Sequence, residues 1–453
     1  MDQTLSKLKA GAQQAHRDGE LDTAMASYAR YLAQVPDDSG IWSNLGVLHR
    51  RAGRHRMALR AHQRALALDP DGVSTMNNAA NVMSDIGQYD ESLALRHRIL
   101  ARTPDDLGQL QMVVRCLRGK GDYAAAISFA TNALARFPDD AELRMQLAFA
   151  QLGQGNYAQG LESYKARWRA GELQPRNLPF PEWQGQSLTG KVIAVLPEQG
   201  FGDAVLFARF LSVLQGRDCR VVMAVKPPLR RLFANLPGVD VMIDGLRADT
   251  KVDYWVNMMD LAALYFQQGG AVPAPAVLTV PDDSRQRARS LVAPYAGKLK
   301  VGVVWTGSVT YRGNGFRSFS HRDVLPLADV PGIQLFSLYK GPELKAYYAD
   351  GADGFIIDTG STERDFADTA AMMQACDLVI TSDTATAHIA GSLGVPVWCI
   401  LHWDAFWVYT HHGASTPWYP QMRLMRQHRP LDWSGVMADV TDALQKTMSE
   451  AKA

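Results

Sequence analysis

Cysteine is scarce in this sequence, and its few copies show no pattern. Only four cysteines occur among 453 residues, and they lack the spacing of metal ligands. We therefore expect small, buried, hydrophobic cysteines in a reducing compartment. They are Cys116, Cys219, Cys376 and Cys399.

Net charge and long apolar runs are also missing. The formal net charge is +1, which gives no bulk electrostatic reason to expect nucleic acid or a membrane surface as a partner. The longest apolar stretches, such as Val395–Leu401, are too short to span a bilayer, and the opening MDQTLSKLKAGAQQ has no apolar core of the signal-peptide type. We expect a cytoplasmic protein with no transmembrane segment. Its apolar fraction of 47% is sufficient for a substantial core.

The first third of the chain carries a strict internal period of 34 residues. Glycine and proline each recur with that step, and a small residue follows each glycine by five places. Glycine is typical of the end of one helix and proline of the end of the next, while a small side chain lets paired helices approach closely. The period is that of tetratricopeptide helix–turn–helix repeats. The glycines are Gly19, Gly53, Gly87, Gly121 and Gly155, the prolines Pro36, Pro70, Pro104 and Pro138, and the small residues Ala24, Ala58, Ser92, Ala126 and Gly160.

We therefore predict five repeat units, followed by a change of pattern. The units are 5–38, 39–72, 73–106, 107–140 and a degenerate 141–174. After a proline-rich connector (Pro175, Pro179, Pro181), short apolar runs alternate with helical patterns, which predicts parallel sheets with right-handed crossovers. The expected helices include 229–236, 365–374, 385–393 and 433–446; the expected strands are 191–196, 219–225, 239–243, 254–257, 300–305, 334–338, 355–358, 378–381 and 395–401.

The predicted architecture is an α-helical solenoid followed by two Rossmann-like α/β domains that face a cleft. The expected boundaries are 1–174 for the repeats, 175–296 for the first α/β domain and 297–453 for the second, whose last helix packs back on the body. A ligand would bind in the cleft between the α/β domains.

One loop that could carry chemistry lies between a predicted strand and a predicted helix. Gln199, Gly200 and Gly202 form a turn that other molecules can approach closely, and Asp203 follows where the helix begins. Asp203 is either a helix cap or a general base that faces the cleft. The loop matches a dinucleotide fingerprint only in part, so it does not indicate NAD.

A second loop runs from Asp383 to His388. Its small residues and hydroxyls open a helix, and the free N–H groups of a helix start favour an anion. Thr384, Ala385 and Thr386 would accept a diphosphate there. His388 either touches the same anion or is a packed core histidine.

A third loop follows the first strand of the second α/β domain. It contains Thr306, Gly307, Arg312 and Arg317, and an arginine there could hold a phosphate through paired hydrogen bonds. The adjacent pair His411-His412 has no acidic or cysteine neighbour, so no metal site is expected. No serine and histidine stand in a nucleophile-elbow context.

At these residues the chain resembles the heptosyltransferase-like, family nine glycosyltransferases, in the subset with N-terminal tetratricopeptide repeats. The similar segments cover nearly the whole chain: PEQGFGDAVLFARFLSVL, VGVVWTGS, FRSFSHRDVLPL, LFSLYKG, CDLVITSDTATAHIAGSLGVPVWCIL and STPWYPQMRLMRQ. The resemblance implies a GT-B fold, a nucleotide-sugar donor and inversion at the anomeric carbon.

The resemblance also implies roles for single residues. Asp203 matches the proposed base; Asp383, Thr384 and His388 match the donor-diphosphate loop; Arg317 approximates a basic donor contact. Lys340 and Glu343 fall near a nucleotide-ribose position. The chain departs from the subset at 402–407 (HWDAFW), where a Trp-Arg-Trp-like cluster is usual, and at Ala385, where glycine is common.

The resulting hypothesis is an inverting, metal-independent glycosyltransferase, since no Asp-Xaa-Asp motif occurs where a metal would hold a diphosphate. It would need no cofactor, because the nucleotide sugar is a substrate, and the repeats would bind a protein acceptor or partner. The alternative is a protein-interaction scaffold whose transferase half binds nucleotide without turnover. A dinucleotide oxidoreductase is disfavoured because no full fingerprint precedes an acidic ribose ligand.

Overall fold

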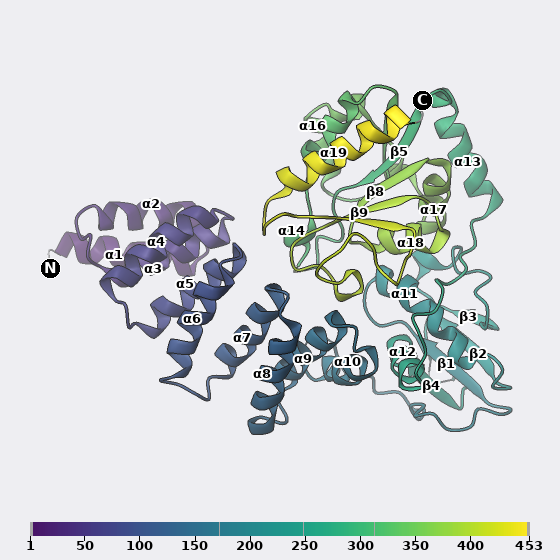
Figure 1. Cartoon of the computed structure of the whole chain (residues 1–453), viewed down its shortest axis with the longest axis horizontal. Coiled ribbons are helices and arrows are strands. Elements are labelled where there is room, and N and C mark those ends of the chain that lie inside the picture. The colour runs from purple at the N-terminus through teal and green to yellow at the C-terminus, as the bar shows by residue number, and fades with distance from the viewer. Residues whose placement is uncertain (1–2, 172, 248, 312, 451–453) are drawn as a thin grey trace. The chain divides into compact units, whose positions relative to one another are not determined.

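A computed structural model describes residues 3–171, 173–247, 249–311 and 313–450 (Figure 1). The predicted order is confirmed, with a helical repeat region first and a parallel-sheet α/β region after it. The chain separates into two compact units, residues 1–150 and 151–453. Each unit is described by itself.

The first unit consists of stacked helix pairs that follow the predicted repeats. All five periodic glycines have positive φ, between 71° and 89°, so each ends its helix in the left-handed conformation that glycine adopts without strain. The five small residues are buried in the second helix of each pair, as predicted. The helices are α1 (Gln3–Arg17), α2 (Leu21–Leu32), α3 (Ser39–Arg51), α4 (His55–Leu68), α5 (Val73–Asp85), α6 (Tyr89–Leu100), α7 (Leu107–Gly119), α8 (Tyr123–Arg136) and α9 (Ala141–Gly153), which crosses into the second unit.

The second unit begins with the last helix of the repeat array. Helix α10 (Tyr157–Tyr164) and the 3-10 helix Lys165–Trp168 complete the fifth repeat in sequence, yet they belong to the compact unit that holds both sheets. Gly160 lets α10 pack closely against α9, since a Cβ there would lie 2.7 Å from Leu152 Cγ. The domain boundaries predicted at 174 and 296 remain a prediction.

The first sheet has four parallel strands in the order β3-β2-β1-β4. Its strands are β1 (Val192–Leu196), β2 (Arg220–Ala224), β3 (Val241–Ile243) and β4 (Tyr254–Asn257), with helices α11 (Phe201–Phe207) and α12 (Met258–Gln267). The predicted helix over 229–236 is wrong: only the 3-10 turn Pro227–Leu229 forms, and turns follow it. Pro227, Pro228 and Pro237 bracket that segment, and proline disfavours helix in the residues before it.

The second sheet has six parallel strands in the order β10-β9-β8-β5-β6-β7. Numbered within the sheet, this is 6-5-4-1-2-3, the doubly wound Rossmann order. The strands are β5 (Leu299–Val304), β6 (Ile333–Ser337), β7 (Ile356–Asp358), β8 (Leu378–Ser382), β9 (Val397–Leu401) and β10 (Met422–Arg426). The helices are α13 (Asp282–Val292), α14 (Asn314–Arg317), α15 (His321–Val324), α16 (Leu344–Ala349), α17 (Phe366–Ala375), α18 (Ala385–Leu393) and α19 (Trp433–Glu450).

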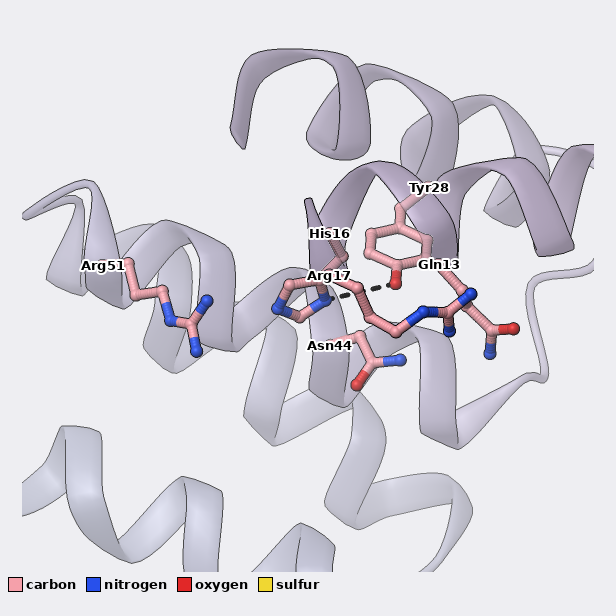
Figure 2. Close-up of a pocket in the computed structure, with 6 residues that line it drawn as sticks. All are labelled: Gln13, His16, Arg17, Tyr28, Asn44 and Arg51. Atoms are coloured by element: carbon pink, nitrogen blue, oxygen red, sulfur yellow. Dashed lines mark hydrogen bonds between the residues drawn. The ribbon is translucent and has the colours of Figure 1, made fainter. Parts of the chain in front are cut away.

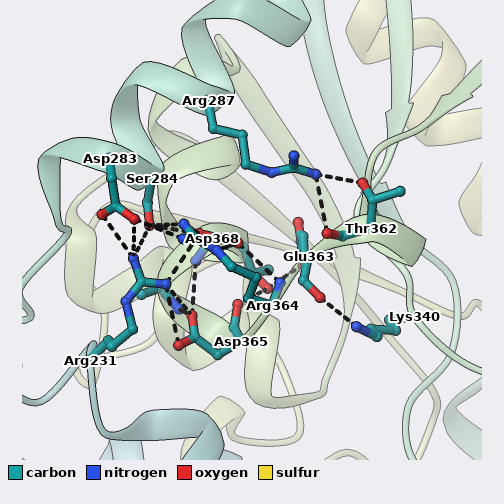
Figure 3. A network of polar contacts seen from close by, with 12 residues as sticks. Arg231, Asp283, Ser284, Arg287, Lys340, Thr362, Glu363, Arg364, Asp365 and Asp368 are labelled. Atoms are coloured by element: carbon teal, nitrogen blue, oxygen red, sulfur yellow. Dashed lines mark hydrogen bonds and ion pairs between the residues drawn. The ribbon is translucent and has the colours of Figure 1, made fainter.

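Within the second unit, a charged network links the turns after β2 of the first sheet to helices α13 and α17 (Figure 3). Arg231, from the turns after β2, contacts Asp283 on α13 at 2.9 Å and Asp365, the N-cap of α17, at 3.2 Å. Arg364 pairs with the same Asp283 and with buried Asp368, at 2.8 and 2.7 Å. The network fixes the first sheet's turns to the helices that flank the second sheet.

Candidate functional site

Both sheets place a predicted loop at the point where strand order reverses. In the first sheet this switch lies between β1 and β4, and the loop after β1 carries Asp203. In the second it lies between β5 and β8, which are followed by the loops containing Thr306 and Asp383. Ligands of open parallel sheets bind at the carboxyl ends of the strands at such switch points. The three loops chosen from the sequence therefore occupy the positions where binding is expected.

The loop of the first sheet lies against the loop of the second. A Cβ built on Gly202 would come within 2.9 Å of His388 Cδ2, 3.3 Å of Ala385 Cα and 3.4 Å of Ala385 N. Only a residue without a side chain fits between these groups. The loop that carries Asp203 therefore packs directly against the start of α18.

Asp203 occupies the third position of α11 and caps it. Its Oδ2 accepts a hydrogen bond of 2.8 Å from the Gly200 N–H. Burial raises the pKa of Asp203, while that hydrogen bond and the charges of Lys226 and Arg317 oppose the rise. The cap and the base interpretations are compatible, because a carboxylate with a raised pKa is a better proton acceptor and only one of its oxygens is needed for the cap.

The start of α18 is an uncapped helix end. Thr384 is its N-cap residue, but the side chain makes no capping hydrogen bond. Instead Thr384 Oγ1 pairs with Thr386 Oγ1 at 2.7 Å, and Thr386 Oγ1 pairs with Thr381 Oγ1 at 2.6 Å. These hydroxyls pair with one another, so the Thr384 side chain does not cap the first N–H groups of α18. Uncapped N–H groups at a helix start favour a bound anion.

Arg317 brings the third loop to the same place. Its Nη1 donates to the Asp383 carbonyl at 2.8 Å, and its Nη2 lies 2.9 Å from a Cβ built on Gly307, beside the Thr384 methyl. Asn314 steadies the turn by donating from Nδ2 to Thr306 Oγ1 at 2.9 Å. The structure thus brings predicted donor residues of the second and third loops together, next to the loop that carries Asp203. Arg312 lies outside the described residues.

Asp383 supports this arrangement. Its Oδ1 is buried without a hydrogen-bond partner among the described residues and lies 4.0 Å from Arg317 Nε, while Oδ2 lies 3.8 Å from His402 Nε2. Burial raises the pKa of Asp383, and His402 and Arg317 oppose the rise. A carboxylate would repel a diphosphate, so Asp383 is better placed to orient Arg317 than to contact the anion.

His388 is a packed, neutral histidine. Its Nδ1 lies 3.1 Å from the Tyr419 hydroxyl, and its ring stacks on Tyr409 at 6.1 Å between centroids. Burial lowers the pKa of His388 to about 3, with Arg209 and Arg317 adding to the effect. A role as imidazolium is therefore not supported, although the ring still borders Gly202.

Lys340 and Glu343, the predicted ribose contacts, share no described contact with the three loops. Lys340 Nζ donates to the Glu363 carbonyl (Figure 3). Glu343 is exposed at the start of α16. The neighbouring Glu363 was missed: its side chain is buried, Oε1 has no partner among the described residues, and burial raises its pKa to about 8.

Several other residues around the site were not identified from sequence. Lys226 donates to the Gln199 carbonyl, and its charge acts on Asp203. Arg209 is buried, its charge acts on His388, and its guanidinium lies 4.8 Å from the Tyr419 ring centroid. His402 lies within the segment that departs from the resembling subset and supplies a basic group there. Only His402 carried a local signal; the others depend on long-range packing.

Among the described residues no cluster of three or more His, Cys, Asp or Glu side chains could hold a metal ion. In the same part of the chain, no helix combines the length and apolarity required to cross a bilayer.

The first unit has a polar pocket of its own (Figure 2). Gln13, His16 and Arg17 reach it from α1, Tyr28 from α2, and Asn44 and Arg51 from α3. His16 Nδ1 and the Tyr28 hydroxyl lie 3.2 Å apart inside it. Burial lowers the pKa of His16, and Arg51 and Arg17 lower it further. The pocket is lined by cations and hydrogen-bonding groups, with no acidic side chain in its lining.

Comparisons with known proteins agree with the repeat assignment. Residues 41–73 and 117–170 match tetratricopeptide-repeat family models, so these segments are tetratricopeptide repeats. Protein FlbA of Caulobacter vibrioides is 28% identical over 320 residues, which are 63% of this chain and 52% of FlbA. The chain thus spans about half the length of that relative.

Similar solved structures fall into two groups. A glycosyl transferase family 9 structure from Veillonella parvula DSM 2008 is 15% identical, with a TM-score of 0.43, over 53% of this chain and 87% of that one. The MamA structure from Desulfovibrio magneticus RS-1 is 16% identical, with a TM-score of 0.36, over 39% and 99%. At these values neither structure assigns a function to the chain.

Proposed function

We propose that the chain is an inverting, metal-independent glycosyltransferase of the GT-B type that moves a sugar from a nucleotide-sugar donor to an acceptor hydroxyl. The observation that carries the proposal is the contact of Gly202 with Ala385 and His388. Gly202 precedes Asp203 and Ala385 begins α18, so this contact supports a proposed base that lies beside a proposed diphosphate site, as transfer from a diphosphate requires. The family resemblance of the same loops supports this proposal.

Each component has a defined task in the proposed reaction. Asp203 takes the proton from the acceptor hydroxyl as that oxygen attacks the anomeric carbon, and the bond from the anomeric carbon to the diphosphate breaks. Arg317 and the first N–H groups of α18 stabilise the charge that gathers on the departing nucleoside diphosphate. The raised pKa of Asp203 assists the proton transfer.

The repeats are proposed to bind a protein acceptor or another protein partner. The pocket lined by Arg17, Arg51 and Asn44 favours a partner segment that carries a carboxylate. In the alternative, this binding is the whole function, and the α/β region retains a nucleotide without turnover.

A thermal-shift series with UDP, GDP, ADP and CDP tests the donor site. Selective stabilisation of the second unit by one diphosphate is expected, because a ligand that binds only the folded state stabilises it. Arg317→Met should abolish the shift, while Arg322→Met, whose side chain pairs on the surface with Asp350, should retain it. No shift with any diphosphate would contradict the donor assignment.

A further inference from the structure

The segment that ends the repeat array is built into the α/β unit through aromatic contacts. The Trp418 indole N–H donates to the Tyr157 hydroxyl at 3.1 Å, and the Tyr157 ring lies 4.9 Å from the Phe266 ring. Phe266 belongs to α12 beside the first sheet, and Trp418 follows β9 of the second. Helix α10 therefore contacts elements that belong to both sheets.

Arg167 fixes the residue that opens the Asp203 loop. Its Nε lies 2.7 Å from Glu198 Oε2 and its Nη2 lies 2.9 Å from Asp260 Oδ1. The side chains of Arg167 and Glu198 are only 2% and 1% exposed, so this ion pair is screened from water. Glu198 Oε1 also accepts from the Met259 N–H at 3.2 Å, which ties the loop's first residue to α12.

Tyr164 fixes the next residue of the same loop. Gln199 Nε2 donates to the Tyr164 hydroxyl at 2.9 Å, and the Arg167 guanidinium lies 5.2 Å from the Tyr164 ring centroid. Burial raises the pKa of Tyr164, and the charge of Asp203 raises it further, so the hydroxyl stays protonated and lies within electrostatic range of the proposed base. The following residue, Gly200, donates to Asp203 itself.

We propose that Tyr164 and Arg167 are positioning residues for the loop Gln199–Asp203, and that the end of the repeat array thereby sets the orientation of Asp203. Three successive residues transmit the constraint: Arg167 holds Glu198, Tyr164 holds Gln199, and Gly200 holds Asp203. The catalytic consequence for Asp203 rests on the proposed function. The predicted effect on how firmly the loop Gln199–Asp203 is held does not depend on that function.

The test uses the full-length chain and three variants. Tyr164→Phe removes one hydroxyl, Arg167→Met removes the buried cation, and Lys165→Met is the matched control. Lys165 lies in the same 3-10 helix, and its exposed side chain pairs with exposed Glu162 on the surface at 2.7 Å. Backbone hydrogen exchange of residues 198–203 is measured without ligand. Turnover of the nucleotide sugar whose diphosphate stabilises the wild type, and affinity for that diphosphate, are measured alongside.

Tyr164→Phe should speed exchange of 198–203 by about fivefold, the factor that corresponds to one net hydrogen bond, and lower kcat by a similar factor. Its affinity for the diphosphate should stay within about twofold of wild type, since the donor loop is untouched. Arg167→Met should have a larger effect, on the order of a hundredfold in exchange, because it leaves a buried carboxylate unpaired. Lys165→Met should match the wild type in each measurement.

The proposal is overturned if both site variants exchange and turn over like Lys165→Met. It is also overturned if Tyr164→Phe weakens diphosphate affinity and kcat equally, since that would indicate general destabilisation. If the wild type consumes no nucleotide sugar, the proposed function fails, and the exchange rates alone then decide whether the segment orders the loop.

Discussion

Replacing Gly202 by alanine adds one methyl group where the two α/β loops meet. The new Cβ would lie 2.9 Å from His388 Cδ2 and 3.3 Å from Ala385 Cα, closer than carbon atoms pack. Neither neighbour can easily retreat, because Ala385 presents backbone and the His388 ring is held by Tyr419 and stacked on Tyr409. The methyl should therefore push the loops apart rather than be absorbed.

The cost should be about 1–3 kcal/mol, the usual range for an extra carbon forced into a packed site. If the diphosphate requires both loops in place, its affinity should fall by a factor of about 5 to 150, as 1.4 kcal/mol corresponds to tenfold. Calorimetric titration of the stabilising nucleoside diphosphate measures the affinity, and thermal unfolding of the second unit measures the strain.

Gly297→Ala is the matched control for this experiment. A Cβ at Gly297 meets no atom within 4 Å, and the residue does not have positive φ. Its stability and affinity should equal those of the wild type. If Gly202→Ala behaves like Gly297→Ala in both measurements, the two loops do not meet as described.

The remaining predictions concern the donor loop, the repeats and the chain's divisions. Thr384→Val should weaken diphosphate binding by about 1 kcal/mol and Ala385→Leu by much more; equal affinities by calorimetry would exclude this helix start as the site. Buried His62 has its pKa lowered to about 4 by burial and Arg50, against about 6.5 when unfolded, so the repeats should lose about 2 kcal/mol between pH 7 and pH 5. Denaturant unfolding should show this loss in the wild type and not in His62→Leu. If the free energy of unfolding falls equally with pH in both proteins, another group than His62 causes the loss. Deleting residues 1–174 should cause aggregation, because it removes side chains that are buried in the α/β unit. Deleting residues 1–140 should leave more soluble protein that still binds nucleotide. If gel filtration shows that the 1–140 deletion aggregates more than the 1–174 deletion, the unit boundary is contradicted.

The sign of the His62 effect follows from proton binding. The folded state, with the lower pKa, binds fewer protons than the unfolded state over that interval. Stability is therefore fully present above the unfolded pKa and is lost as the pH falls towards the folded one. Both ring nitrogens of His62 lack a described partner, so no other bond stabilises the charged form.

Local signals were sufficient to predict the repeats and most of the strands. The repeat glycines adopt positive φ because the chain must turn there, and the same requirement makes them periodic in sequence. Strand β10 was missed because two arginines occur within its five residues, as an edge strand tolerates. The helix expected over 229–236 failed because the flanking prolines outweigh its apolar spacing.

The candidate site was predictable only where it depends on a local turn. The Asp203 and Thr384 loops each combine a strand end with a helix start, which a sequence can show. The contact between Arg167 and Asp260 joins residues 93 positions apart and has no local signature. The charge state of His388 likewise depends on burial by residues from distant segments.

Sugar transfer measured with and without the Asp203 carboxylate tests both the proposed reaction and its proposed base. Full-length wild type and Asp203→Asn are incubated with UDP-, GDP-, ADP- and CDP-activated sugars and a pool of protein acceptors, and both diphosphate release and acceptor mass are followed. The amide oxygen of the Asp203→Asn side chain should still accept the Gly200 hydrogen bond, so folding and diphosphate affinity should be unchanged. We expect the wild type to transfer one sugar and Asp203→Asn to transfer it roughly a hundredfold more slowly. Equal turnover by the two proteins would contradict the catalytic assignment, and no transfer by the wild type would contradict the proposed function itself.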